Sequence, residues 1–217
     1  MKRRPVFAVF FLAALLTGCS IAQPFAKVDY YELDYPSPAL KSIAVLDCVV
    51  GVRRFGIASA FDHDRLVEKE KDLRTTQTYY YRWVTNPRMM LSELLMRDLL
   101  ASGGFKAVVM MPANVLTDYE INGFVQEILK DNSLSQSKVR VAMNMILLQS
   151  SLSPQEANRI VFQKTYASEK PCSPGGPTGV AKAMSAAYQE ISERIQCDVV
   201  EQIKNCKPSA QPPAQQN

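Results

Sequence analysis

The sequence contains a single histidine, His63, among its 217 residues. Any catalytic arrangement that pairs a serine or cysteine nucleophile with a histidine base would have to use this residue. It stands in the polar run Phe61-Asp62-His63-Asp64-Arg65, with no nucleophile elbow nearby. The chain also has no phosphate-binding glycine loop, because Gly175-Gly176 lies among prolines. We therefore expect His63 to lie in a surface loop, and we expect neither enzymatic activity nor a cofactor.

Long apolar runs are equally scarce, and the only one spans residues 6–16. As a helix it would measure roughly 16 Å, against about 30 Å for the hydrocarbon core of a bilayer. It follows Lys2-Arg3-Arg4 and precedes Leu16-Thr17-Gly18-Cys19. A basic segment, a short apolar segment and a small residue before the cleavage point are typical of a secretory signal peptide. We therefore expect residues 1–18 to be removed.

The cysteine that follows this signal makes Leu16-Thr17-Gly18-Cys19 resemble a bacterial lipobox. The resemblance implies that Cys19 is acylated and becomes the first residue of the mature protein. Several acyl chains would hold it to a membrane, at about 0.8 kcal/mol per buried CH₂ group. Residues 19–28 would then form a tether. By resemblance to lipoprotein sorting in enterobacteria, an aspartate directly after the acylated cysteine would favour retention in the inner membrane. This chain has Ser20 at that position, so we expect the outer membrane.

A strong charge of one sign is also missing from the mature chain. The full sequence carries 25 basic and 21 acidic residues. The signal peptide accounts for three of the basic residues and for none of the acidic ones, so the mature chain is almost neutral. Nothing in this balance indicates binding to nucleic acid.

Besides Cys19, the mature chain has four cysteines: Cys48, Cys172, Cys197 and Cys206. They show no CxxC or Cys-His spacing, so we expect no metal site. An even number in an oxidising compartment suggests disulfides, although three pairings are possible. We predict a Cys197–Cys206 bridge, which requires the last helix to fray or turn before Cys206. Cys48 fits a buried thiol inside a strand, with Cys48–Cys172 as the second pair if the oxidised protein has no free thiol.

The pattern of apolar residues predicts one α+β domain over residues 29–204, followed by a disordered tail at 205–217. A capping asparagine and a proline open a helix at Asn86-Pro87, and Gly103-Gly104 ends it. A second amphipathic helix is predicted from about 178 to 204. Strands are predicted at 30–33, 42–50, 65–70, 76–84, 105–111, 119–129, 139–147 and 160–167. We expect a largely antiparallel sheet of about six to eight strands, with the two helices on one face.

The most unusual composition outside the signal is Tyr79-Tyr80-Tyr81-Arg82-Trp83. On a regular strand, Tyr79, Tyr81 and Trp83 would share one face, and Tyr80 and Arg82 the other. Such residues either fill a core or form a contact surface, because tyrosine, tryptophan and arginine dominate interface hot spots. We predict that Trp83 belongs to the core, and that Arg65, Tyr80 and Arg82 lie on the exposed side and contact a partner.

The order of these motifs resembles the family of ABC-type transport auxiliary lipoprotein components, the group that includes the paraquat-inducible lipoprotein C. The resemblance covers roughly residues 19–204 and rests on the lipobox and on short motifs: Tyr30-Tyr31-Glu32-Leu33, Ile43-Ala44-Val45, Asp64-Arg65-Leu66-Val67, the tyrosine run, and a leucine-rich helix from Pro87 that ends before Gly104-Phe105-Lys106-Ala107-Val108. The chain departs from the family in its C-terminal cysteines, in the loop at 171–177 and at Val84.

The resemblance implies an outer-membrane lipoprotein whose domain faces the periplasm. Its partners would be an ABC permease and ATPase and a mammalian-cell-entry (MCE) domain protein, in the traffic of lipids or hydrophobic compounds. The alternative is a structural or assembly lipoprotein of the envelope, such as an activator of cell-wall synthesis or an outer-membrane assembly factor. A lipid-anchored hydrolase is disfavoured by the lone histidine.

Overall fold

The computed structural model describes residues 27–38, 45–133, 135–150, 159–172 and 176–206. Cys19, the signal peptide, most of the tether and the tail after residue 206 lie outside these residues. The described chain forms two helices and nine strands: β1 (Asp29–Tyr31), β2 (Leu46–Arg53), β3 (Gly56–Ile57), β4 (Arg65–Lys69), β5 (Thr75–Trp83), α2 (Pro87–Ala101), β6 (Phe105–Met111), β7 (Tyr119–Asp131), β8 (Lys138–Gln149), β9 (Arg159–Pro171) and α3 (Gly176–Asn205).

The strands form one open, mixed sheet, which confirms the α+β class. Three long strands, β7, β8 and β9, form antiparallel pairs. The other edge of β7 pairs in parallel with β2, β3 and β4 along its length. The sheet therefore has nine strands and many parallel pairs, where the sequence predicted six to eight largely antiparallel strands. The difference arises because β2 and β4 pair with a strand far along the chain, which apolar alternation does not reveal.

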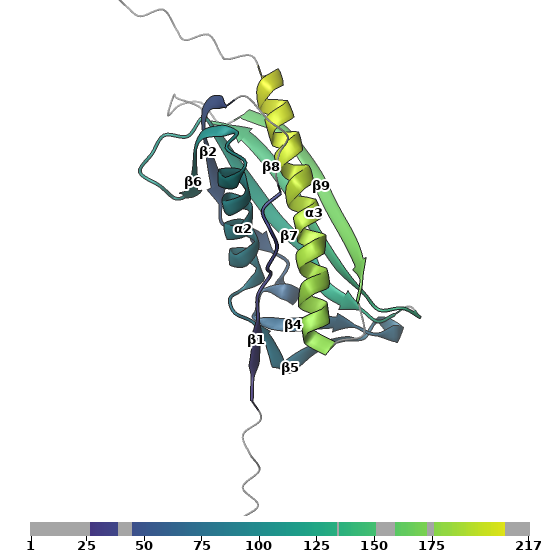
Figure 1. Cartoon of the computed structure of the whole chain (residues 1–217). Coiled ribbons are helices and arrows are strands. Elements are labelled where there is room, and N and C mark those ends of the chain that lie inside the picture. Colours follow the sequence, from purple (N-terminus) through teal and green to yellow (C-terminus); the bar gives the residue numbers. More distant parts are fainter. Residues whose placement is uncertain (1–26, 39–44, 134, 151–158, 173–175, 207–217) are drawn as a thin grey trace, which may run out of the picture.

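Both helices cover the same face of the sheet, as predicted (Figure 1). The face of α3 predicted to be apolar is almost completely buried: Met184, Tyr188, Ile191, Ile195 and Val199. It packs on β8 and β9, where alternate residues from Val139 to Leu147 are also buried. At the start of α2 the side chain of Asn86 accepts a hydrogen bond from the Arg88 amide at 3.1 Å, and Pro87 occupies the first turn. Gly103, with φ of 62°, follows the end of this helix.

A buried carboxylate joins the two helices to the segment after β1. Asp98, on α2, is completely buried and accepts hydrogen bonds from the Tyr35 hydroxyl at 2.7 Å and the Ser192 hydroxyl at 2.6 Å. The Arg97 guanidinium bonds to its other oxygen at 2.8 Å and lies over the Tyr35 ring. Burial raises the pKa of Tyr35 far above its ordinary value, so Tyr35 remains a hydrogen-bond donor.

Among the described residues the structure has no disulfide, and Cys48, Cys172, Cys197 and Cys206 are free thiols. The predicted Cys197–Cys206 bridge is therefore not shown and stays a prediction. In the structure α3 continues unbroken to Asn205, and the Cys206 amide still bonds to the Gln202 carbonyl. At about 100° per residue, nine residues place the two side chains on opposite sides of the helix.

The alternative pair, Cys48 and Cys172, is separated by the length of β7. Cys48 is next to Val49, whose carbonyl accepts from the Asp118 amide beside the start of β7. Cys172 bonds through its amide to Ser137, near the other end of that strand. Cys48 is buried, as expected for a thiol inside a strand.

Candidate contact site

The hairpin of β4 and β5 contains a wide bulge that displaces its tyrosines from the ladder. Val67 pairs with Gln77, but the next pair joins Arg65 to Arg82, so β5 has extra residues between the two points. The Thr78 hydroxyl donates to the Tyr81 carbonyl at 2.7 Å and closes this bulge. The regular alternation expected for residues 79–83 is therefore broken.

Residues 79–81 of the bulge and Tyr30 of β1 are exposed, and we name this group the tyrosine surface: Tyr30, Tyr79, Tyr80 and Tyr81. The rings of Tyr79 and Tyr80 meet edge to face, with centroids 5.1 Å apart. Because β1 pairs with β5, Tyr30 lies opposite Arg82, next to this group. Large amphipathic rings that remain exposed are a common component of binding interfaces.

The three predicted contact residues lie on the same hairpin but differ in their surroundings. Tyr80 is exposed, whereas Arg65 and Arg82 are half-buried. Arg82 pairs with Asp64 at 3.2 Å, and its guanidinium lies 5.6 Å from the centre of the Tyr79 ring. Much of its hydrogen-bonding capacity is therefore used within the hairpin.

The alternation rule placed Tyr79 and Tyr81 on the same face as Trp83, and this was wrong. Trp83 is 1 % exposed and belongs to the core, as predicted, but the two tyrosines lie outside it. Tyr30 was missed as well. The run of three tyrosines was itself the signal of an unusual surface, but its bulge could not be inferred from a two-residue period.

His63 has a local structural role. Its ring is half-buried between a short 3₁₀ turn and β4, and Nδ1 accepts a hydrogen bond from the Arg65 amide at 3.2 Å. This contact supports the start of β4. His63 was expected to lie in a surface loop, and the structure places it in a turn where its side chain is partly buried.

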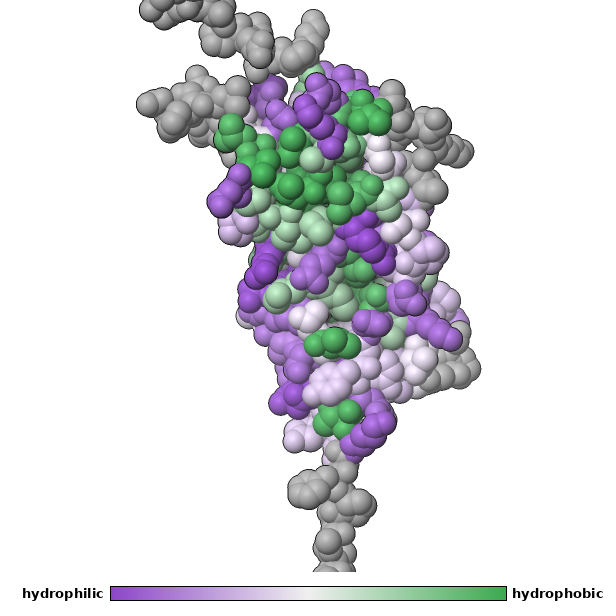
Figure 2. All heavy atoms as spheres, turned by 60° about the vertical axis from the view of Figure 1, so that its left-hand side comes forward, coloured by the Kyte–Doolittle hydropathy of each residue, from purple (hydrophilic) through white to green (hydrophobic). Residues whose placement is uncertain are grey.

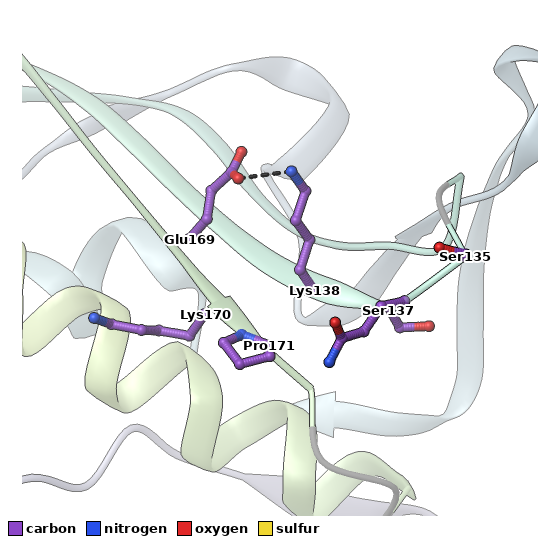
Figure 3. A pocket seen from close by; sticks show the side chains of 7 residues that line it. Ser135, Ser137, Lys138, Glu169, Lys170 and Pro171 are labelled. Atoms are coloured by element: carbon purple, nitrogen blue, oxygen red, sulfur yellow. Dashed lines mark hydrogen bonds and ion pairs between the residues drawn. The ribbon is translucent and has the colours of Figure 1, made fainter.

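An open depression of about 420 Å³ lies at the ends of β8 and β9. Figure 3 shows Lys138 and Glu169, which both line it, pointing toward one another, and their charged groups are 2.6 Å apart. A second hollow of about 340 Å³ lies between the segment after β1 and α2, and Glu32, Val84 and Arg97 are among its lining residues.

Two further observations limit what the described part of the chain can hold. Its histidine, cysteine and carboxylate side chains nowhere gather in a group of three suited to a metal ion. None of its helices is both long and apolar enough to cross a membrane.

Comparison with known families gives one match, which covers most of the chain. The family model of the ABC-type transport auxiliary lipoprotein component matches residues 31–196. No curated protein shows significant similarity to the sequence.

Solved structures share the fold at low sequence identity. Protein XCC0632 from Xanthomonas campestris is 18 % identical, with a TM-score of 0.74 over 82 % of this chain and 98 % of that protein. A second crystal structure, of an uncharacterized protein, is 13 % identical, with a TM-score of 0.61 over 80 % of this chain and 99 % of that one.

Proposed function

Because this chain belongs to the family of ABC-type transport auxiliary lipoproteins, we propose that it is a lipid-anchored adaptor of an ABC transport system for lipids or hydrophobic compounds. Its family is an auxiliary component of transport and not an enzyme family. The adaptor connects the periplasmic, MCE-type component of the transporter to the outer membrane. It acts by binding and bridging.

The anchor in this proposal is Cys19, acylated after removal of residues 1–18. The described chain begins with β1 at one end of the molecule, and β5 lies beside it there (Figure 1). The tyrosine surface is carried by these two strands, so it lies at the end from which the tether leaves. A protein bound there would be held close to the anchored membrane.

The exposed tyrosine surface is the observation that carries the contact proposal. Tyr30 and Tyr79 are each 59 % exposed, far more than a tyrosine that serves only to fill a core. Arg65 and Arg82 stand on the same hairpin and complete a surface of aromatic and basic character. We propose that Tyr80 and the two arginines contact the periplasmic component.

Affinity purification of the tagged lipoprotein from envelope extracts tests the function. We expect the MCE-type protein to be recovered together with the permease and ATPase. Recovery of cell-wall synthases or outer-membrane assembly factors in their place would contradict the proposal and favour an assembly lipoprotein.

A Cys19→Ser variant tests the anchor separately. It should yield a soluble or unprocessed species, whereas we expect the wild-type protein to fractionate with outer membranes. A processed variant that still fractionated with membranes would show that the lipobox interpretation is wrong.

A further inference from the structure

The hollow between α2 and the segment after β1 continues the proposed contact surface, and we name it the α2 hollow. Its volume is about 340 Å³. Val84, which lines it, directly follows Trp83, and the Val84 amide donates a hydrogen bond to the Tyr31 carbonyl at 2.8 Å. Tyr31 is in turn the neighbour of Tyr30, a member of the tyrosine surface. A protein bound on the tyrosine surface would therefore be able to reach into the α2 hollow.

The uncharged lining of the α2 hollow is mostly apolar, although the hollow lies in a hydrophilic region of the molecule. Its apolar side chains are those of Leu33, Val84, Met90 and Leu94. Figure 2 shows a broad apolar area in the half that lies away from β1 and β5, whereas the half near these strands is mostly hydrophilic. A confined apolar lining of this size suits one or two side chains of a partner better than a broad hydrophobic interface.

The charged residues of the α2 hollow leave an excess of negative charge. Glu32 and Glu93 both line it and are exposed, and within the described residues neither forms an ion pair. Arg97 lines it too, but its guanidinium donates to Asp98 through Nε at 3.0 Å and Nη2 at 2.8 Å. The positive charge of Arg97 is thus balanced by a carboxylate outside the lining. Two negative charges remain available to a cation from another molecule.

We infer that the α2 hollow accepts a lysine or arginine side chain of the periplasmic MCE-type component. The apolar stem of such a side chain would contact Leu33, Val84 and Leu94, while its charged group would lie beside Glu32 and Glu93. Complementary charges at an interface steer association and favour the correct partner. This inference rests on the proposed function, because it names the kind of side chain through which that component contacts the lipoprotein.

Binding of the purified MCE-type protein to the lipidated, full-length protein in liposomes tests the inference. A double variant, Glu32→Gln with Glu93→Gln, should weaken binding by about fivefold, because the partner's cation loses both carboxylates. The binding that remains should depend less on the NaCl concentration than that of the wild-type protein. The matched control is Glu193→Gln with Glu201→Gln, which removes the same charge from exposed positions of α3 and should leave binding unchanged.

Val84→Lys tests the same hollow in a different way. It places an ammonium group of the lipoprotein itself in the lining of the α2 hollow, so it repels the partner's cation and occupies part of its space. We expect it to weaken binding by about tenfold. Val84 is 58 % exposed, so its replacement should leave the melting temperature nearly unchanged, as measured by circular dichroism.

The outcomes separate this inference from the proposed function. If the double glutamine variant bound as tightly as the wild-type protein, or if the α3 control weakened binding equally, the basic side chain would be excluded and the adaptor function left intact. A loss in Val84→Lys alone would assign the hollow to an apolar side chain instead. Absence of any binding by the wild-type protein would overturn both proposals. A homodimer that forms without the MCE-type protein and is lost in the double variant would assign the hollow to a second copy.

Discussion

The hydroxyl of Tyr35 lies 2.7 Å from a carboxylate oxygen of Asp98, although 63 residues separate them in the chain. This bond ties the segment after β1 to α2, and Ser192 extends the connection to α3. The three parts of the helical layer thus meet at one buried charge. Such a group is costly to bury unless its oxygens are bonded, which makes each donor important for stability.

Replacing Tyr35 with phenylalanine should destabilise the domain by about 1–3 kcal/mol, because Asp98 loses a donor and cannot replace it with water. Urea unfolding followed by circular dichroism measures the change. Tyr80→Phe removes a hydroxyl from an exposed ring and should alter the free energy of unfolding by less than about 0.5 kcal/mol. Equal losses in the two variants would show that the Tyr35–Asp98 bond does not stabilise the fold.

Substitutions of Trp83 and Tyr80 should have different effects, the first on the stability of the domain and the second on partner binding. Trp83→Ala leaves a cavity in the core and should cost about 3–5 kcal/mol. Tyr80→Ala should leave the melting temperature nearly unchanged but weaken capture of the MCE-type protein. A Tyr80→Ala variant that bound its partner normally but lost affinity for liposomes would instead assign the tyrosine surface to the bilayer.

Glu190 should make stability depend on pH in the acidic range. Bonds from Lys170 at 2.6 Å and Ser168 at 3.0 Å lower its pKa in the folded protein. Its contribution is therefore present above the pKa of the unfolded chain and is lost as the pH falls through the lower, folded value. Glu190→Gln should cost less than about 1 kcal/mol at pH 7, because the pair is partly exposed.

The effect of this substitution should shrink as the pH falls below the ordinary pKa of an unfolded glutamate, about 4.3, and should vanish only below the lower pKa of the folded state, where the wild-type carboxylate is protonated too. Urea unfolding at several pH values measures it. Glu193→Gln on the exposed side of α3 is the control and should show little change at any pH. If Glu190→Gln lowered the free energy of unfolding by the same amount at pH 3 and at pH 7, the negative charge of Glu190 would not be the cause of the stabilisation.

Thiol labelling should distinguish the cysteines by their exposure. Cys197 is exposed on α3 and should react first with iodoacetamide at pH 8. Burial raises the pKa of Cys48 to about 11, so little thiolate is available, and we expect this residue to react only after unfolding. Mass spectrometry of the labelled peptides gives the order. A Cys197–Cys206 crosslink in a non-reducing digest would contradict the free thiols.

The local elements of this fold were largely predictable from the sequence, because their signals are local. Asn86-Pro87 marked the start of α2 correctly, and the alternation from Val139 to Leu147 identified the buried face of β8. The apolar face of α3 was also correct. In each case the pattern reports directly which side of one element is buried.

Pairing and contact between distant segments were not predictable in this way. The parallel pairing of β4 with β7 joins strands that are far apart in the chain, so no local pattern reveals it. The bulge around Tyr79 depends on the register between β5 and β4. Asp98 did leave a signal, since it follows Leu91 and Leu95 on the buried face of α2. An acidic residue on the apolar face of a helix indicates a buried hydrogen bond, but it does not identify Tyr35 as the donor.

The pairing of β7 has a consequence for how the protein folds. Strands β2 and β6 form one group and strands β4, β5 and β1 form another, and among the described residues the two groups are joined in the sheet only through β7. All of them precede β7 in the chain, so the N-terminal half cannot complete its sheet until residues 119–131 are available. Contacts between segments this far apart close large loops and slow folding. A chain truncated before Tyr119 would hold two separate groups of strands, with exposed edges prone to aggregation.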